Sequence, residues 1–378
     1  MQLRFNAETV NRSWRYMIAV DFVIMGAGFL FTVFLDSPRL APYMHLLVTY
    51  HFGFVRRALI GTIVSWFTDV VPLWYVYALA AAAWITTLVL FVAAFRKIFG
   101  FSHKTAPLFA FIFGSPFFLK NFAITIGHFD IYGCLWALAA LLLPAGLAYP
   151  LVIAAGCVVL VLIHHLHFLL YIPTISFIAL VRYCLLGGSS AGRIGYCAAL
   201  GLAVSAVFVA TAFFGRMPVP LETFLDYVSV RASDPINIYT ASMWYSTIQE
   251  EIASTWDHLG MNIIRVPVYV VLIALHLPVG MYLRAVIAAL PTALLRTVTI
   301  MALATITIGY LAIFVVAYDY SRWVSGWAVC MFLALHAIRL LPSTANVHET
   351  PIRADRPRNL VLGWIVTAIP RVGVTIPF

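Results

Sequence analysis

The chain has 378 residues, of which 63% are hydrophobic and 10% are charged, and its mean hydropathy is +0.98. A soluble protein of this length cannot bury so much apolar surface, so the composition excludes a soluble globular protein and predicts one that spans a membrane. The formal net charge is +9. We attribute this surplus to membrane topology, and nucleic-acid binding is not needed to explain it.

Apolar windows of about 17 to 22 residues, a length that crosses a hydrocarbon core, recur along the chain. The first follows an arginine-bearing flank and lacks a small-residue cleavage site, so we expect a retained helix rather than a signal peptide. We expect an all-α, polytopic fold that makes residues 1–378 a single integral membrane domain. About ten membrane helices are predicted, at 17–35, 74–95, 105–121, 131–147, 149–166, 168–184, 194–214, 264–282, 298–317 and 323–340.

Lysines and arginines set the orientation, because cytoplasmic segments carry more of them than outer segments do. With ten helices and a cytoplasmic N-terminus, 15 of the 23 basic residues lie on the cytoplasmic side, and ten of the 14 acidic residues lie outside. The C-terminus and a tail at 341–378 are then cytoplasmic. A segment at 36–72 and a large loop at 216–263 are then extracytoplasmic.

The outer segment 36–72 is too polar for two membrane helices and too apolar for a free loop. It contains APYMHLLVTY and HFGFVRRALIG. We expect two short amphipathic helices along the membrane surface, with His45, His51, Arg56 and Arg57 toward water or a cavity. Adjacent arginines point in different directions on a helix, so one can face the protein while the other reaches lipid headgroups. The alternative is that both arginines only anchor to headgroups.

Two further groups of charged residues are expected at the outer surface. KNFAITIGHFDIYG holds Lys120, His128 and Asp130, and YDYSRW holds Asp319 and Arg322. An aspartate and an arginine three residues apart can also simply pair with each other, with little benefit if they are exposed. Charged groups from well-separated segments therefore converge on one face of the membrane.

The HHLH sequence places His164 and His167 on one face at the end of a helix. Neutral imidazole and carboxylate suit transition metals, so a divalent cation held here is one hypothesis. The alternative is that these histidines bond to headgroups, backbone or water. Asp21, inside the first window, is either a relay residue or the partner of a neighbouring helix.

Several catalytic signatures are missing from the sequence, which has no Walker-type phosphate loop, no HExxH and no GxSxG. The five cysteines lie in or beside apolar windows, and no disulfide in the outer loops is expected. The large outer loop is rich in aromatic residues. It is suited either to stacking on sugars or to covering the membrane surface as a lid.

The layout resembles the GT-C superfamily of integral membrane glycosyltransferases. The resemblance rests on a first helix that starts inside, an acidic residue at its outer end (Asp36), surface helices before the second span, and charged groups in later outer loops. The usual pair of adjacent acids in the first outer loop is reduced here to Asp36. GFVRR and YDYSRW are also similar to sequences of bacterial polysaccharide-synthesis membrane proteins. The resemblance implies an inner-membrane enzyme that transfers a sugar from a polyprenyl-phosphate carrier to a glycan or lipid acceptor on the outer side.

Such a transfer needs cations for the phosphate and a general base for the acceptor hydroxyl. The candidates for phosphate and substrate binding are Arg56, Arg57, Arg322, Lys120 and His51. Asp36 is the first candidate for the base, through the resemblance. The other candidates are Asp130, Asp319 and, if its pKa is near neutral, His128.

Two other functions stay open at this point. One is a polysaccharide polymerase or ligase of the Wzy type, whose pyrophosphate-linked donor requires more positive charge. The other is a transporter or flippase, for which charged or broken helices at mid-membrane and internal repeats are expected.

Overall fold

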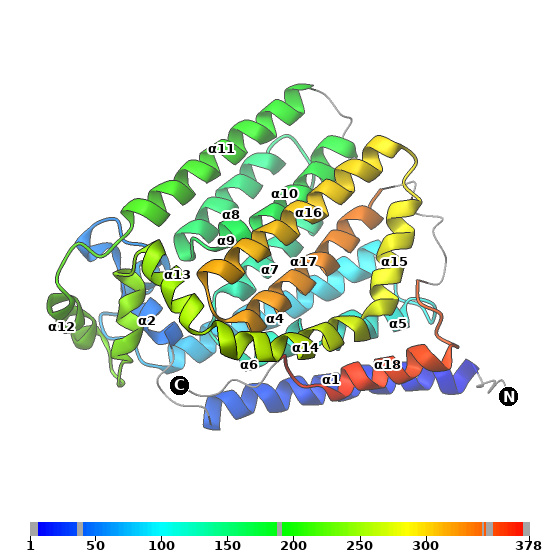
Figure 1. Ribbon diagram of the computed structural model, residues 1–378, viewed down its shortest axis with the longest axis horizontal. Coiled ribbons are helices and arrows are strands. Elements are labelled where there is room, and N and C mark those ends of the chain that lie inside the picture. Colours follow the sequence, from blue (N-terminus) through cyan, green and yellow to red (C-terminus); the bar gives the residue numbers. More distant parts are fainter. Residues whose placement is uncertain (1–6, 36–40, 187–190, 342–343, 345–350, 373–378) are drawn as a thin grey trace.

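The computed structural model describes residues 7–35, 41–186, 191–341, 344 and 351–372 (Figure 1). This part of the chain is helical and contains no strand, although one isolated β-bridge joins Val71 and Ala232. The all-α prediction is therefore confirmed. The helices of the first half are α1 (Ala7–Leu35), α2 (Ala41–Leu47), η1 (Tyr50–Phe52), α3 (Leu59–Ser65), α4 (Trp74–Ile98), α5 (Ala106–Phe113), α6 (Leu119–Ile124), α7 (Asp130–Leu142), α8 (Tyr149–Ile163), α9 (His167–Leu170), α10 (Ile172–Ala179) and η2 (Leu180–Leu185). Those of the second half are α11 (Ala191–Phe214), α12 (Leu221–Arg231), η3 (Ile238–Trp244), α13 (Ile248–Asp257), α14 (Leu259–Leu275), α15 (Leu277–Ala288), α16 (Ala293–Val316), α17 (Tyr320–Arg339) and α18 (Pro357–Ala368).

Five of these helices, α1, α4, α11, α16 and α17, are long and apolar enough to cross a membrane, which indicates an integral membrane protein. A sixth span results if α13 and α14, which meet at a bend of 69°, are counted together. The prediction of ten spans is wrong. Helices α7 and α8 have only 13 and 15 residues. At about 1.5 Å per residue they are shorter than a hydrocarbon core of about 30 Å. The number of spans was overestimated because the apolar windows of the sequence continue through the loops in which α7 and α8 end.

Helix α17 lies at the centre of the bundle, where it packs against α7, α10 and α16. Its side chains are buried along most of its length, unlike those of the other long helices. A helix enclosed by protein has a fixed position and rotation. The first turn of α17 therefore provides a rigid support for the residues at that end of the bundle.

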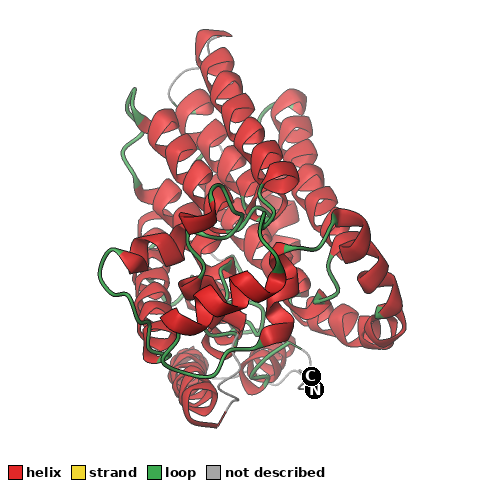
Figure 2. Cartoon of the chain, turned by 90° about the vertical axis from the view of Figure 1, so that its left-hand side faces the viewer, coloured by secondary structure: helices red, strands yellow, loops and turns green. Residues whose placement is uncertain are grey.

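The segment 41–76 and the segment 217–245 fold together into a small unit, which we call the cap. It has a hydrophobic core of its own, in which Tyr43, Met44, Phe224 and Trp244 are buried together. Figure 1 shows α2 and α12 at one end of the bundle, and Figure 2, viewed from that side, shows helices and loops crossing in front of the bundle. Two short helices, α2 and α3, do form in the segment predicted to hold surface helices. Helix α2 is enclosed by the cap, however, and His45 is buried.

The segment predicted as a tail, 341–378, contains α18, which packs alongside α1 (Figure 1). The last turn of α18 is held by Lys120. Its ammonium donates to the carbonyl oxygens of Thr367 at 2.7 Å and Val366 at 3.2 Å, and pairs with Asp21 at 2.7 Å. Asp21 lies midway along α1, and both charged side chains are fully buried. Lys120 is therefore within the bundle, and its expected place at the outer surface is wrong.

Candidate functional site

Arg322 connects three residues from two distant parts of the chain at the cap end of the bundle. Its Nε donates to Asp319 at 2.5 Å, and one terminal nitrogen donates to His128 Nδ1 at 2.8 Å and to Asp130 at 3.2 Å. The side chains of Arg322 and Asp130 keep 20% and 17% of their surface exposed. We call these four residues the acid cluster. The cluster is organised by protein contacts and is still open to a ligand.

Local sequence explains how these residues are positioned. Asp319 is the residue before α17, where an aspartate usually caps the helix, but its carboxylate makes no capping bond and binds Arg322 instead. Gly127 precedes His128 and has a positive φ of +78°. A Cβ at Gly127 would lie 2.7 Å from Val76, so only glycine fits this turn. The turn brings His128 and the start of α7 to the first turn of α17.

These contacts determine which side chains of the acid cluster are charged. Partial burial would raise the pKa of Asp319, but the charge and hydrogen bond of Arg322 hold that pKa below its usual value. Burial and the Arg322 charge lower the pKa of His128 to about 3. His128 is therefore neutral at pH 7, and because its Nδ1 accepts from Arg322, the ring proton lies on Nε2. The condition for His128 as a general base, a near-neutral pKa, is not met in this arrangement.

Arg57 is buried and positively charged, and it has no hydrogen-bond or ion-pair partner among the residues that the structure describes. Burial and repulsion from Arg56 lower its pKa to about 10, which leaves it charged at pH 7. Its φ of +61° is the single positive value of a residue other than glycine in the described chain. Such backbone strain is found where a side chain is held for a purpose.

Arg56, the neighbour of Arg57, has a different environment. Its guanidinium donates to the backbone oxygen of Ser246 at 2.9 Å and lies 3.6 Å from the Glu251 carboxylate. Its backbone oxygen accepts from the Trp244 indole at 2.9 Å. Arg56 therefore joins the cap to α13, and its charge is matched by Glu251.

The positive charge of Arg57 acts on three histidines. Burial, followed by repulsion from Arg57, lowers the pKa of His45, His164 and His165 well below the usual value. The rings of His45 and His164 lie 4.5 Å and 6.3 Å from that of Phe129, which joins His128 to Asp130 in the chain. His45 and His165 each have a buried Nδ1 without a partner. Neutral imidazoles, an unpaired arginine and the acid cluster thus meet under the cap.

Other predicted site residues are placed elsewhere or are not described. His51 is exposed on the cap, where its ring stacks on Tyr227 at 4.8 Å. Asp36 lies outside the described residues, so its role as a base stays a prediction. The rings of His164 and His167 are 6.0 Å apart. Within the described ranges, no three His, Cys, Asp or Glu side chains are grouped as a metal ion requires. The five cysteines are free.

Sequence reasoning placed His45 toward water or a cavity but did not name it or His165 as a site residue, and it missed Trp244 and Glu251 as partners of Arg56. His165 was overlooked because HHLH was treated as a helix face. Helix α8 ends at Ile163 and His164 is extended, so the helical spacing does not apply. The partners Trp244 and Glu251 are 188 and 195 residues from Arg56, and no local pattern connects them.

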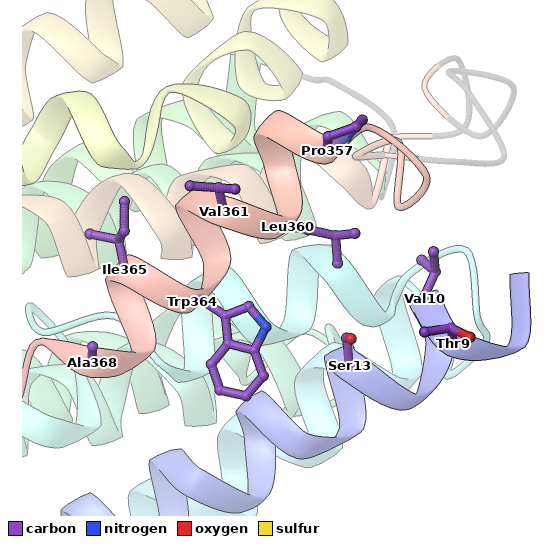
Figure 3. A pocket seen from close by; sticks show the side chains of 9 residues that line it. All are labelled: Thr9, Val10, Ser13, Pro357, Leu360, Val361, Trp364, Ile365 and Ala368. Carbon is purple, nitrogen blue, oxygen red and sulfur yellow. The ribbon is translucent and has the colours of Figure 1, made fainter. Parts of the chain in front are cut away.

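Two hollows of the described structure lie away from this site. One of about 500 Å³ lies between α1 and α18, where Leu360 and Trp364 of α18 lie opposite Val10 and Ser13 of α1 (Figure 3). The other lies between α1 and α4 and is discussed below. In comparisons with known proteins, no family model, no curated protein and no solved structure matches the chain.

Proposed function

We propose that this protein is a membrane glycosyltransferase that moves a sugar from a polyprenyl-phosphate-linked donor to a glycan or lipid acceptor. The observation that carries the proposal is Arg57, a buried cation that forms no ion pair among the described residues and lies at the cap end of the bundle. Burying an arginine that has no partner costs folding free energy unless an anion binds to it. The anion of a membrane-anchored donor reaches this depth.

In the proposed reaction Arg57 holds the donor phosphate. The acceptor oxygen forms a bond to the anomeric carbon of the sugar, while the bond between that carbon and the phosphate oxygen breaks. The polyprenyl phosphate leaves with the electron pair, and Arg57 stabilises its added charge. Neutral histidines such as His165 donate N–H groups to the same anion.

Asp130 is the described residue best suited to take the acceptor proton. One of its oxygens accepts from Arg322 at 3.2 Å, and the other accepts no hydrogen bond from the described residues and is free to approach a hydroxyl. Both oxygens of Asp319 are occupied, by Arg322 and by Ser321 at 3.0 Å. Asp319 therefore holds Arg322 in place, and Arg322 positions Asp130.

The charge balance of the site bears on the choice between a monophosphate and a pyrophosphate donor. Arg56 is matched by Glu251, and Arg322 by two aspartates. Arg57 forms no ion pair among the described residues, and Arg231, which is buried in the cap and donates to the backbone oxygen of Leu47, forms none either. The proposal takes transfer of one sugar from a monophosphate donor as the reaction, and the vesicle test below separates it from a polymerase or ligase reaction.

Transport is the second candidate function, and two observations favour it. The span α13–α14 is bent by 69°, and Asp21 and Lys120 form an ion pair at mid-membrane. Broken helices and buried charges are features of transporters. Lys120 is bound by Asp21 and by backbone carbonyls, however, which suits a fixed structural contact better than a moving charge.

The test uses the purified protein in vesicles that contain one donor at a time and a lipid extract of the host as acceptor. The donors are a polyprenyl-phosphate monosaccharide and a polyprenyl-pyrophosphate oligosaccharide. Release of polyprenyl phosphate with labelling of an acceptor supports the proposal. Turnover of the pyrophosphate donor alone favours the polymerase, and movement of an intact donor across the bilayer without turnover favours transport.

A further inference from the structure

A groove between α1 and α4 has a volume of about 630 Å³. Its walls are Phe22 of α1 and a strip of α4 that contains Leu88, Val89, Val92 and Ala93, and it ends at Arg96 and Lys97. The Phe22 ring packs on Phe113 of α5 at 4.7 Å, which fixes the α1 wall. The groove lies between two helices that are both long enough to span a membrane.

The groove changes from apolar to basic along its length. Helix α4 begins beside the cap, so Arg96 and Lys97, in its last turn, lie at the opposite end of the bundle. Both side chains are exposed, and no acidic residue of the described chain pairs with either. Arg15 lies seven residues before Phe22, on the same face of α1 and toward the same end.

This arrangement matches one lipid molecule. An acyl chain fits the apolar strip between Phe22 and Val92, and a headgroup then lies level with Arg96 and Lys97. Because no carboxylate neutralises these cations, a headgroup with net negative charge is favoured over a zwitterionic one. The polyprenyl donor is not the natural occupant, since its phosphate belongs at the cap end of the bundle.

We propose that this groove binds one anionic phospholipid of the leaflet opposite the cap. Its acyl chain lies between α1 and α4, and its phosphate pairs with Arg96 and Lys97. The site is separate from the proposed catalytic site, and only the exclusion of the polyprenyl donor as its occupant rests on the glycosyltransferase proposal.

Native mass spectrometry of the full-length protein tests this proposal. The protein is released from mixed micelles that contain equal amounts of phosphatidylglycerol and phosphatidylcholine, and the lipid retained on the protein is counted. We expect one phosphatidylglycerol to be retained in preference to phosphatidylcholine. The double variant Arg96→Gln/Lys97→Gln should lower this preference by roughly tenfold to thirtyfold.

Two variants separate this groove from general attraction of basic residues to lipid. Ala93→Trp fills the groove but keeps both cations, and should also abolish the retained lipid. Arg296→Gln removes an exposed arginine in the first turn of α16 at the same end of the bundle, and should leave retention unchanged. Equal retention of the two lipids by the unmodified protein would overturn the proposal. So would phosphatidylglycerol retention that is lost with Arg296→Gln as readily as with the groove variants.

Discussion

Arg56 and Arg57 are adjacent and both buried, but only Arg56 forms an ion pair among the described residues, with Glu251 at 3.6 Å, while the same carboxylate acts on Arg57 from beyond ion-pair distance. The bonds of Arg56 join the cap to α13, whereas the charge of Arg57 acts on the buried His45 and His165 and on the half-buried His164. Two neighbouring residues of the same type thus have separate roles. The predictions below depend on this separation.

Replacing Arg56 should lower stability more than it lowers donor affinity. Arg56→Met leaves Glu251 and the Ser246 carbonyl without their donor, and we expect a loss of roughly 2–4 kcal/mol in the free energy of unfolding. Glu251→Gln keeps the bond from the Ser246 hydroxyl and should cost about 1 kcal/mol. Thermal unfolding in detergent measures both. An Arg56→Met protein that melts like the unmodified one would remove the structural role.

Asp130 is expected to act as the general base. Asp130→Asn keeps the size of the side chain and its bond to Arg322 but loses basicity, so turnover should fall by roughly 10²–10⁴-fold with donor binding retained. Turnover of labelled donor and binding of donor in the absence of acceptor separate the two effects. Near-normal turnover of Asp130→Asn, with an inactive Asp36→Asn or Asp319→Asn protein, would move the base to one of those residues.

The pH dependence of kcat/KM should not show the titration of a histidine with an ordinary pKa. Since its pKa is lowered to about 3, His128 stays neutral as the pH falls from 7.5 to about 5, and its bond to Arg322 persists. Asp319, whose pKa is also lowered, stays ionised over the same range. The ratio kcat/KM should therefore show no decline centred between pH 6 and 7 that depends on His128. An inflection in that interval that disappears in His128→Asn would contradict this expectation.

The Lys120–Asp21 pair should couple α1 to α18. Lys120→Met leaves a buried carboxylate in the bundle and should cost roughly 3–5 kcal/mol, while Asp21→Leu combined with Lys120→Met should cost much less. A double-mutant cycle on unfolding in detergent measures the difference. Strictly additive effects of the two changes would show that the pair is not coupled.

Much of the architecture could be predicted from the sequence, because apolar composition requires a bilayer and helices are the simplest structure that satisfies backbone groups there. The same apolar windows overstate the number of spans, since α7 and α8 are short helices inside the bundle. Hydropathy measures apolar length and does not show where a helix ends. The proline at the start of α8 is a local sequence signal for where that helix begins. No such signal marks its end, where His164 adopts an extended backbone conformation.

The candidate site was predictable only in part. YDYSRW and the HFD of KNFAITIGHFDIYG were recognised, and the pairing of Asp319 with Arg322 was one of the stated alternatives. Lys120 was misplaced because its partner, Asp21, is about 100 residues away on another helix. The contrast between Arg56 and Arg57 depends on Glu251 and Trp244, which approach only when the cap forms. Such contacts follow from tertiary packing, which spacing in the sequence does not reveal.

The most direct test of the proposed function is donor binding to Arg57 variants. Arg57→Lys keeps a charge but loses the planar fork, whereas Arg57→Gly removes the cation and suits the positive φ at this position. We predict that both proteins melt at or above the temperature of the unmodified protein, with Arg296→Lys as the control. We also predict that both bind a polyprenyl-phosphate monosaccharide at least about tenfold more weakly. Unchanged donor affinity and turnover in both Arg57 variants, at equal abundance, would contradict the account.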